Sequence, residues 1–191
     1  MQIKKSTIVL GLVFLIATQT GCDNDSNAQQ QAVDFTSSFS GSFVSTSENT
    51  DTNKDGRPAF IRTYKGKSNL GKITINTIDE FAQPIPPVTC PEGNQEFLLV
   101  RGSFVYRVEN GDLLLGELES GISCFDPVKR NSVITLTGNF TEGTGGFANI
   151  SGSVEMKINS MFLNTTAVNG FASGGSTGTA TGTINLPNGG N

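Results

Sequence analysis

Only a few side chains in this 191-residue sequence are able to act as catalytic or ligand-binding groups. The chain has no histidine, which excludes histidine-based catalytic triads and histidine-ligated zinc or iron. Its three cysteines are Cys22, Cys90 and Cys124. Ser-Lys chemistry stays open, but no motif locates it. Among the carboxylates, Glu117 and Glu119 stand out because they lie in the clearest strand pattern of the chain.

That strand pattern predicts a β-hairpin around Asn110-Gly111. Runs of alternating apolar residues flank this dipeptide, which favours a two-residue hairpin turn. With such a turn, Glu117 lies opposite Phe104. The same face of the hairpin carries Tyr106 and Glu119, and because it is mainly apolar we expect it to point inward.

An inward carboxylate would give the protein a group that binds a ligand or transfers a proton. Desolvation disfavours the charged form of a carboxylate in an apolar interior. Glu117, Glu119 and Tyr106 are therefore candidate ligand-binding residues, and no catalytic residue is assigned. The alternative is a one-residue bulge at the turn, which would return both glutamates to solvent.

The cysteines predict one disulfide. If Cys22 is used elsewhere, Cys90 and Cys124 remain as a pair. A bond between them would close a loop of about 34 residues and stabilise the fold by roughly 3–4 kcal/mol. The alternative is two free thiols in a metal or redox site, but the chain offers neither a CxxC spacing nor a histidine for such a site.

A short acidic segment partly matches a calcium-binding loop. Asp51, Asn53 and Asp55 stand at the first, third and fifth positions, and Gly56 follows at the sixth. The twelfth position, where a bidentate glutamate is required, is Arg62. We therefore favour an Asx-type turn over a calcium site and expect no other cofactor.

The N-terminus predicts export and lipid attachment. Lys4 and Lys5 precede an apolar run over residues 8–17, which is too short to span a bilayer and is typical of a secretory signal peptide. The run ends at Thr20-Gly21-Cys22, which resembles the lipobox of bacterial lipoproteins, although Gln19 stands where leucine is usual. Acylation of Cys22 is the prediction, and ordinary secretion with cleavage nearby is the alternative.

These features divide the chain into three parts. Residues 1–21 form the signal peptide, residues 22–33 a polar tether, and residues 34–191 a single domain. Without Lys4 and Lys5, 11 basic and 17 acidic residues give a net charge of −6. That balance argues against nucleic acid or an anionic membrane surface as a partner, so membrane contact is expected through the lipid alone.

The domain is predicted to be all-β. Short alternating runs bounded by Gly, Asn or Pro indicate about nine antiparallel strands. A closed barrel or a two-sheet sandwich would accommodate them, and the small residues on one face of residues 177–184 favour a small barrel of about eight strands. Besides the hairpin, the predicted strands are Phe35–Thr46, Phe60–Lys65, Lys72–Thr77, Ser132–Thr141, Ile150–Asn159, Phe162–Ala172 and Thr177–Leu186.

The segment GNFTEGTGGFANISG, residues 138–152, resembles the GGTGRFxGATG signature of secreted bacterial barrels that are similar to plant allene oxide cyclases and dirigent proteins. Glu142 replaces the first glycine of that signature and Gly146 its arginine. The resemblance is best over residues 90–158. It implies an eight-stranded antiparallel barrel of the allene oxide cyclase or calycin type. Because structural glycines and turns make up the signature, it implies a fold and carries over no catalytic residue.

Three functions are compatible with this sequence. The first, which we favour, is a lipid-anchored extracytoplasmic binding or interaction module without enzymatic activity, which takes a small apolar ligand or a surface protein as its partner. The second is a cofactor-free, isomerase-like enzyme that uses an interior carboxylate such as Glu117. The third is a structural or adhesive surface protein stabilised by calcium at Asp51–Asp55. The expected location is the bacterial cell envelope, on either membrane and either face.

Overall fold

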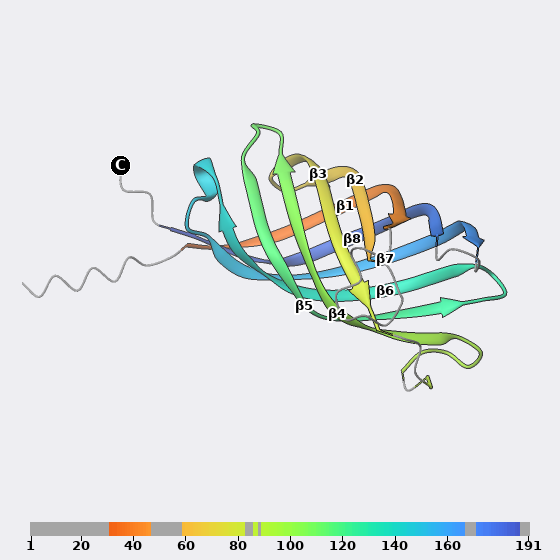
Figure 1. Cartoon of the computed structure of the whole chain (residues 1–191). Helices are drawn as coiled ribbons and strands as arrows, with labels where there is room; N and C mark the ends of the chain where they lie inside the picture. Colours follow the sequence, from red (N-terminus) through yellow and green to blue (C-terminus); the bar gives the residue numbers. More distant parts are fainter. Residues whose placement is uncertain (1–30, 47–58, 83–85, 88, 167–170, 188–191) are drawn as a thin grey trace, which may run out of the picture.

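The eight strands close into an antiparallel barrel. The computed structural model describes residues 31–46, 59–82, 86–87, 89–166 and 171–187. Each strand pairs with the next along the chain, and β1 also pairs with β8, so the sheet has no open edge (Figure 1). The strands are β1 Gln31–Ser45, β2 Phe60–Ser68, β3 Gly71–Phe81, β4 Gln95–Val108, β5 Leu113–Asp126, β6 Asn131–Gly143, β7 Ser151–Thr166 and β8 Phe171–Leu186, with a 3-10 turn at Gly145–Phe147.

The barrel is closed by phenylalanines on β1 that face glycines on β8. Phe39 pairs with Gly178, and Phe43 with Gly174. A Cβ atom on Gly178 would lie 2.6 Å from the Phe39 ring, so only glycine leaves room for the aromatic side chain there. This explains why β8 alternates outward threonines with very small inward residues.

Aromatic rings fill part of the barrel interior. Phe35, Phe104, Tyr106 and Phe140 come from the three strands β1, β4 and β6, and each is at most 2% exposed. Their ring centroids lie 5.3 to 6.2 Å apart, mostly with edge-to-face geometry. Such contacts are favourable for aromatic groups beyond the area they bury. The inward position predicted for Tyr106 is therefore confirmed.

Two strands that the sequence predicts as separate lie largely in one long strand, β7. The sequence predicts separate strands over residues 150–159 and 162–172, but β7 runs from Ser151 to Thr166 and β8 begins at Phe171. Asn159-Ser160 looks like a turn in the sequence, yet both residues keep regular pairing with β6 and β8. The barrel therefore has eight strands rather than nine. At the other end of the chain, β1 begins at Gln31, so residues 31–33 of the expected tether belong to the barrel.

The register predicted for the central hairpin is wrong by one residue. Ser103, not Phe104, pairs with Glu117. The Val108 backbone N–H donates to the Asp112 carbonyl at 3.0 Å, which leaves a three-residue loop with Gly111 at a φ of +94°. A loop of this length turns the glutamate face outward, because a one-residue slip exchanges the two faces of a strand.

Glu117 and Glu119 are consequently exposed, and Leu114, Gly116 and Leu118 are the inward residues in this part of β5. Glu117 is thus not an interior carboxylate, and the expectation from the sequence is wrong on this point. No helix among the described residues is long and apolar enough to cross a membrane.

Candidate functional site

The two ends of the barrel differ in how the strands are connected. At the turn end, β1 begins and β8 finishes, short turns join β2 to β3 and β4 to β5, and residues 144–150 join β6 to β7. At the loop end, longer connections join β1 to β2 over residues 46–59 and β3 to β4 over residues 82–94. Binding residues are often carried by such loops on a rigid scaffold, so the interior of the loop end is the candidate site.

A buried ion pair occupies the barrel interior toward the loop end. Arg62 on β2 and Asp79 on β3 have side chains that are 2% and 0% exposed. The Arg62 Nε donates to Asp79 Oδ1 at 2.8 Å, and its Nη2 donates to Oδ2 at 2.9 Å. This bidentate geometry gives a strong charge-assisted contact. Thr77 donates a further hydrogen bond to Asp79 Oδ1 at 3.1 Å.

Phenyl rings surround the guanidinium. The Arg62 Cζ atom lies 5.2 Å from the ring centroids of both Phe43 and Phe60. Phe162 contacts the Phe43 ring at 4.9 Å and the Phe125 ring at 5.2 Å. The four rings thus form one aromatic cluster, and two of them, Phe43 and Phe60, lie near enough to the cation for their faces to attract the positive charge.

Hydroxyl groups complete this layer of the interior. Arg62 Nη1 donates to Ser160 Oγ at 3.4 Å, and Ser160 shares a 2.8 Å hydrogen bond with Ser176. Ser123 and Ser132 share another at 2.6 Å. All four serines are less than 9% exposed. We call Arg62, Asp79, Thr77 and these serines, with the four rings, the loop-end layer.

The loop-end layer holds two opposite charges, on Arg62 and Asp79, that neutralise each other. Burial lowers the pKa of Arg62, but the charge and hydrogen bonds of Asp79, together with Tyr64, more than offset this effect, so the pKa stays above its ordinary value and the guanidinium remains protonated. Burial raises the pKa of the neighbouring Tyr64 phenol, against the opposing effect of Arg62. The layer therefore combines a compensated cation, an anion and neutral hydroxyls, which suits hydrogen bonding rather than proton abstraction.

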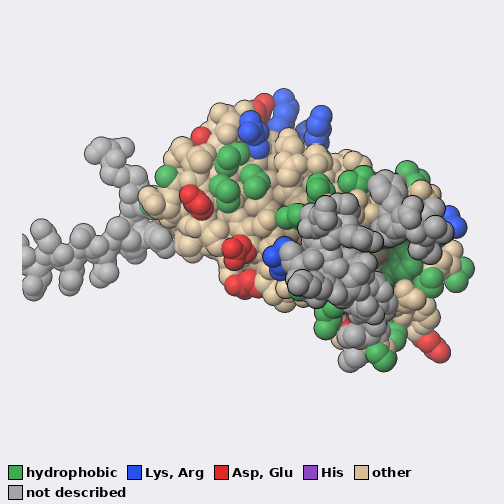
Figure 2. Space-filling model, viewed as in Figure 1, with side chains coloured by type: hydrophobic (Ala, Val, Ile, Leu, Met, Phe, Trp, Pro, Cys, Tyr) green, Lys and Arg blue, Asp and Glu red, His purple; other side chains and the backbone are tan. Residues whose placement is uncertain are grey.

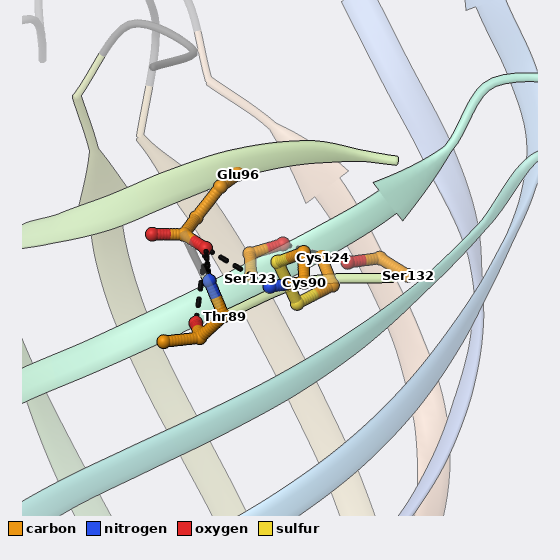
Figure 3. Close-up of a disulfide and its surroundings, with 6 residues drawn as sticks. All are labelled: Thr89, Cys90, Glu96, Ser123, Cys124 and Ser132. Atoms are coloured by element: carbon orange, nitrogen blue, oxygen red, sulfur yellow. Dashed lines mark hydrogen bonds between the residues drawn. A yellow bond between two sulfur atoms is a disulfide. The ribbon is translucent and has the colours of Figure 1, made fainter. Parts of the chain in front are cut away.

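A disulfide fastens the β3–β4 connection to the outside of the same end (Figure 3). Cys90 and Cys124 are bonded, with their Cα atoms 5.5 Å apart, so the predicted disulfide is confirmed. Glu96, only 2% exposed, lies beneath this connection. Its Oε2 accepts hydrogen bonds from the Thr89 N–H and hydroxyl and from the Cys90 N–H at 2.9 to 3.1 Å. One carboxylate and one covalent bond thus hold the connection in place.

The remaining predicted site residues do not meet in this layer. Tyr106 lies in the barrel interior, among the aromatic rings near the turn end of β4. Glu117 lines a shallow outer groove of about 400 Å³ with Glu80 and Arg101, and not the interior. Cys22 and the candidate calcium ligands Asp51, Asn53 and Asp55 lie outside the described residues. Within the described ranges, no three cysteine or carboxylate side chains gather as metal ligands would.

Sequence reasoning missed Arg62 and Asp79, although a signal for them is present. In β2, Arg62 has the same parity as the buried Tyr64, and in β3, Asp79 has the same parity as the buried Ile73 and Ile75. Opposite charges on the apolar faces of neighbouring strands indicate a buried pair. Finding it requires the β2–β3 register, in which Arg62 pairs with Thr77, two residues before Asp79.

Comparisons with known proteins give little beyond this geometry. No protein-family model matches the chain, and no curated protein matches it. A solved structure of the pterocarpan synthase dirigent protein aligns with a TM-score of 0.25 and 9% identity, covering 83% of this chain and 93% of that one. The barrel architecture rests on the strand pairing of this chain itself.

Proposed function

We propose that this protein is a lipid-anchored, extracytoplasmic binding module without catalytic activity, which meets its ligand or partner at the loop end of the barrel. The observation that carries this proposal is the loop-end layer. A buried ion pair is weak evidence for stability, because well-packed apolar residues often stabilise a fold equally well. We therefore assign the ion pair, with its surrounding hydroxyls and aromatic rings, to recognition at the loop end rather than to stability.

The positions of the chain ends support a binding role. Gln31 of β1 pairs with Leu186 of β8, so both ends of the barrel chain lie at the turn end. A tether from an acylated Cys22 would enter at that end and leave the loop end pointing away from the membrane. The disulfide-fastened β3–β4 connection then belongs to the presented surface.

The enzymatic alternative was based on Glu117 as an interior carboxylate, and Glu117 does not lie in the interior. Glu117 is exposed, and the buried carboxylate of the loop-end layer is Asp79, which accepts hydrogen bonds from Arg62 and Thr77. Both oxygens of this carboxylate are already engaged by these donors, and the side chain is buried, so it presents no free acceptor to a substrate. The structural alternative depends on calcium at Asp51–Asp55, a segment outside the described residues.

Native mass spectrometry of the protein purified gently from its own host tests the proposal. We compare the parent chain with an Arg62→Met/Asp79→Leu double variant, which replaces the ion pair by apolar side chains of similar shape. The matched control is Lys72→Gln/Glu109→Gln, which removes an exposed ion pair at the turn end. Urea unfolding of all three proteins verifies that each is folded.

The proposal expects an organic or protein adduct on the parent and on the control, and none on the folded double variant. Equal adducts on all three proteins would contradict recognition at the loop-end layer. A parent that carries no adduct, and captures no neighbour when cross-linked in its own host, would contradict the binding role itself.

A further inference from the structure

Basic side chains gather on the outer face of three adjacent strands. The group consists of Lys65 and Lys67 on β2, Lys72 on β3 and Arg107 on β4, all of them exposed. The strand register brings them together, because Lys67 pairs directly with Lys72 while Thr74 pairs with both Lys65 and Arg107. Figure 2 shows Lys and Arg side chains gathered at the top of the view, over the region where Figure 1 labels β2 and β3. We call these four residues the basic face.

Carboxylates neutralise the basic face only in part. Glu109 Oε1 lies 3.1 Å from Lys72 Nζ. Among the described residues, no carboxylate forms an ion pair with Lys65, Lys67 or Arg107. Like charges directly opposite each other on neighbouring strands, such as Lys67 and Lys72, destabilise a sheet. A chain with a mature net charge of −6 thus concentrates unneutralised positive charge on one flank, which indicates an anionic partner.

The basic face lies beside the point where the chain enters the barrel. Asn69, in the β2–β3 turn, donates to the Asp34 carbonyl at 2.7 Å and accepts from the Thr36 N–H at 3.0 Å. The turn therefore packs against the first residues of β1. Residues 22–30 reach at most about 30 Å even when extended. The 15 residues of β1 span about 50 Å. An anchored barrel would thus keep its turn end, with the basic face, close to the bilayer.

We infer that the basic face docks on the anionic headgroup surface of a phospholipid bilayer and sets the orientation of the barrel. Net charge alone predicts no such contact, because it averages the basic face with the acidic remainder of the surface. The argument from the tether rests on the acylation proposed for Cys22, whereas the argument from charge does not. The surface is also separate from the loop-end layer, so either assignment can fail without the other.

Vesicle co-sedimentation of the expected mature chain, residues 22–191 with Cys22→Ser, isolates the contribution of the protein surface. The probes are vesicles of pure phosphatidylcholine and vesicles in which about a third of the lipid is phosphatidylglycerol. The test variant is Lys65→Gln/Lys67→Gln/Arg107→Gln. The matched control, Lys129→Gln/Arg130→Gln/Lys157→Gln, removes the same charge from exposed positions away from the basic face.

We expect the parent and the control to bind the anionic vesicles only, with binding lost as ionic strength rises. The test variant should bind at least about tenfold more weakly, since each basic residue near an anionic surface contributes severalfold. Equal binding of both triple variants, or no preference of the parent for anionic vesicles, would overturn the assignment. Binding to DNA but not to vesicles would also overturn it and would identify a nucleic acid as the anionic partner.

Discussion

At the scale of single residues, the buried ion pair carries a large desolvation penalty. Two charges have been taken out of water, and the gain depends on the bidentate contact between Arg62 and Asp79. Ser160 and Thr77 satisfy further hydrogen-bonding groups of the pair. The pair is therefore tolerated only as a complete unit, which makes a comparison of the single Arg62 variant with the double variant informative.

We expect Arg62→Met to lower the free energy of unfolding by about 3–5 kcal/mol, because it leaves the Asp79 carboxylate buried without its counter-charge. The double variant Arg62→Met/Asp79→Leu should recover most of this loss, since it removes both charges and fills the space. Urea unfolding at pH 7 measures both effects. A double variant as unstable as the single one would show that the pair contributes net stability.

The Glu96 carboxylate makes a second buried contact that can be tested separately. It accepts three hydrogen bonds from Thr89 and Cys90. Hydrogen bonds to charged groups are worth more than neutral ones, so Glu96→Gln should cost about 2 kcal/mol of unfolding free energy. Glu92→Gln, an exposed change in the same connection, is the control and should cost nothing measurable. Equal effects of the two substitutions would contradict the assigned role.

At the scale of elements, the seam between β1 and β8 depends on pairing large residues with glycine. A Cβ on Gly178 would lie 2.6 Å from the Phe39 ring and 2.7 Å from the Lys157 carbonyl oxygen. We expect Gly178→Ala to cost about 1–3 kcal/mol through overpacking. Gly175→Ala provides the control, because its Cβ would meet nothing closer than a backbone oxygen at 3.7 Å. Thermal melting of both variants checks the difference.

The β5–β6 turn is held by a carboxylate whose pKa is lowered. Asp126 accepts backbone hydrogen bonds from Val128 and Lys129, both at 2.9 Å, and these bonds, with the Lys129 charge, lower the pKa of Asp126. A lowered pKa in the folded state contributes stability above the ordinary value of the group. That contribution is lost as the pH falls through the lowered pKa.

Asp126→Asn should therefore reduce the urea midpoint slightly at pH 7, and the difference from the parent should shrink as the pH approaches 2. Urea titrations at several pH values measure this change. A difference that is constant with pH would show that the carboxylate charge plays no part in the turn.

Most elements were predictable because their side chains alternate, but their limits were not. Phe35, Phe39 and Phe43 correctly indicate an inward face of β1, since even spacing in a strand keeps one face. By contrast, Asn159-Ser160 resembles a turn but continues β7, because pairing on both sides outweighs local preference. The hairpin register failed for a related reason. Asn110-Gly111 is compatible with two loop lengths, and they expose opposite faces.

At the scale of the whole molecule, barrel closure was predictable and the site was not. The small residues of β8 correctly favour a closed barrel over a sandwich. The loop-end layer combines Arg62, Asp79 and Ser160, from β2, β3 and β7, which only the closed topology brings together. Without the strand register, the sequence does not indicate that Arg62 and Ser160, 98 positions apart, are in contact. The basic face was hidden for the same reason, because composition reports total charge and not its placement.

The Cys90–Cys124 disulfide is the covalent link with the broadest effect on the molecule. It joins the β3–β4 connection to β5 across a sequence separation of 34 residues. In the chain-entropy account, a loop of this size destabilises the unfolded state and adds roughly 3–4 kcal/mol to the unfolding free energy. We expect Cys90→Ala/Cys124→Ala to lose about that amount while keeping the barrel, because the eight strands pair without the bond.

We compare urea unfolding of the oxidised parent, the reduced parent and the double-alanine variant. The comparison distinguishes the stability contributed by the disulfide bond from that contributed by the cysteine side chains. The reduced parent and the variant should unfold at similar urea concentrations, below that of the oxidised parent. Cys22→Ser serves as the control, since the barrel disulfide does not involve that residue. If reduction left the midpoint unchanged, the Glu96 hydrogen bonds would be sufficient to hold the connection. The disulfide would then fix the presented surface without stabilising the fold.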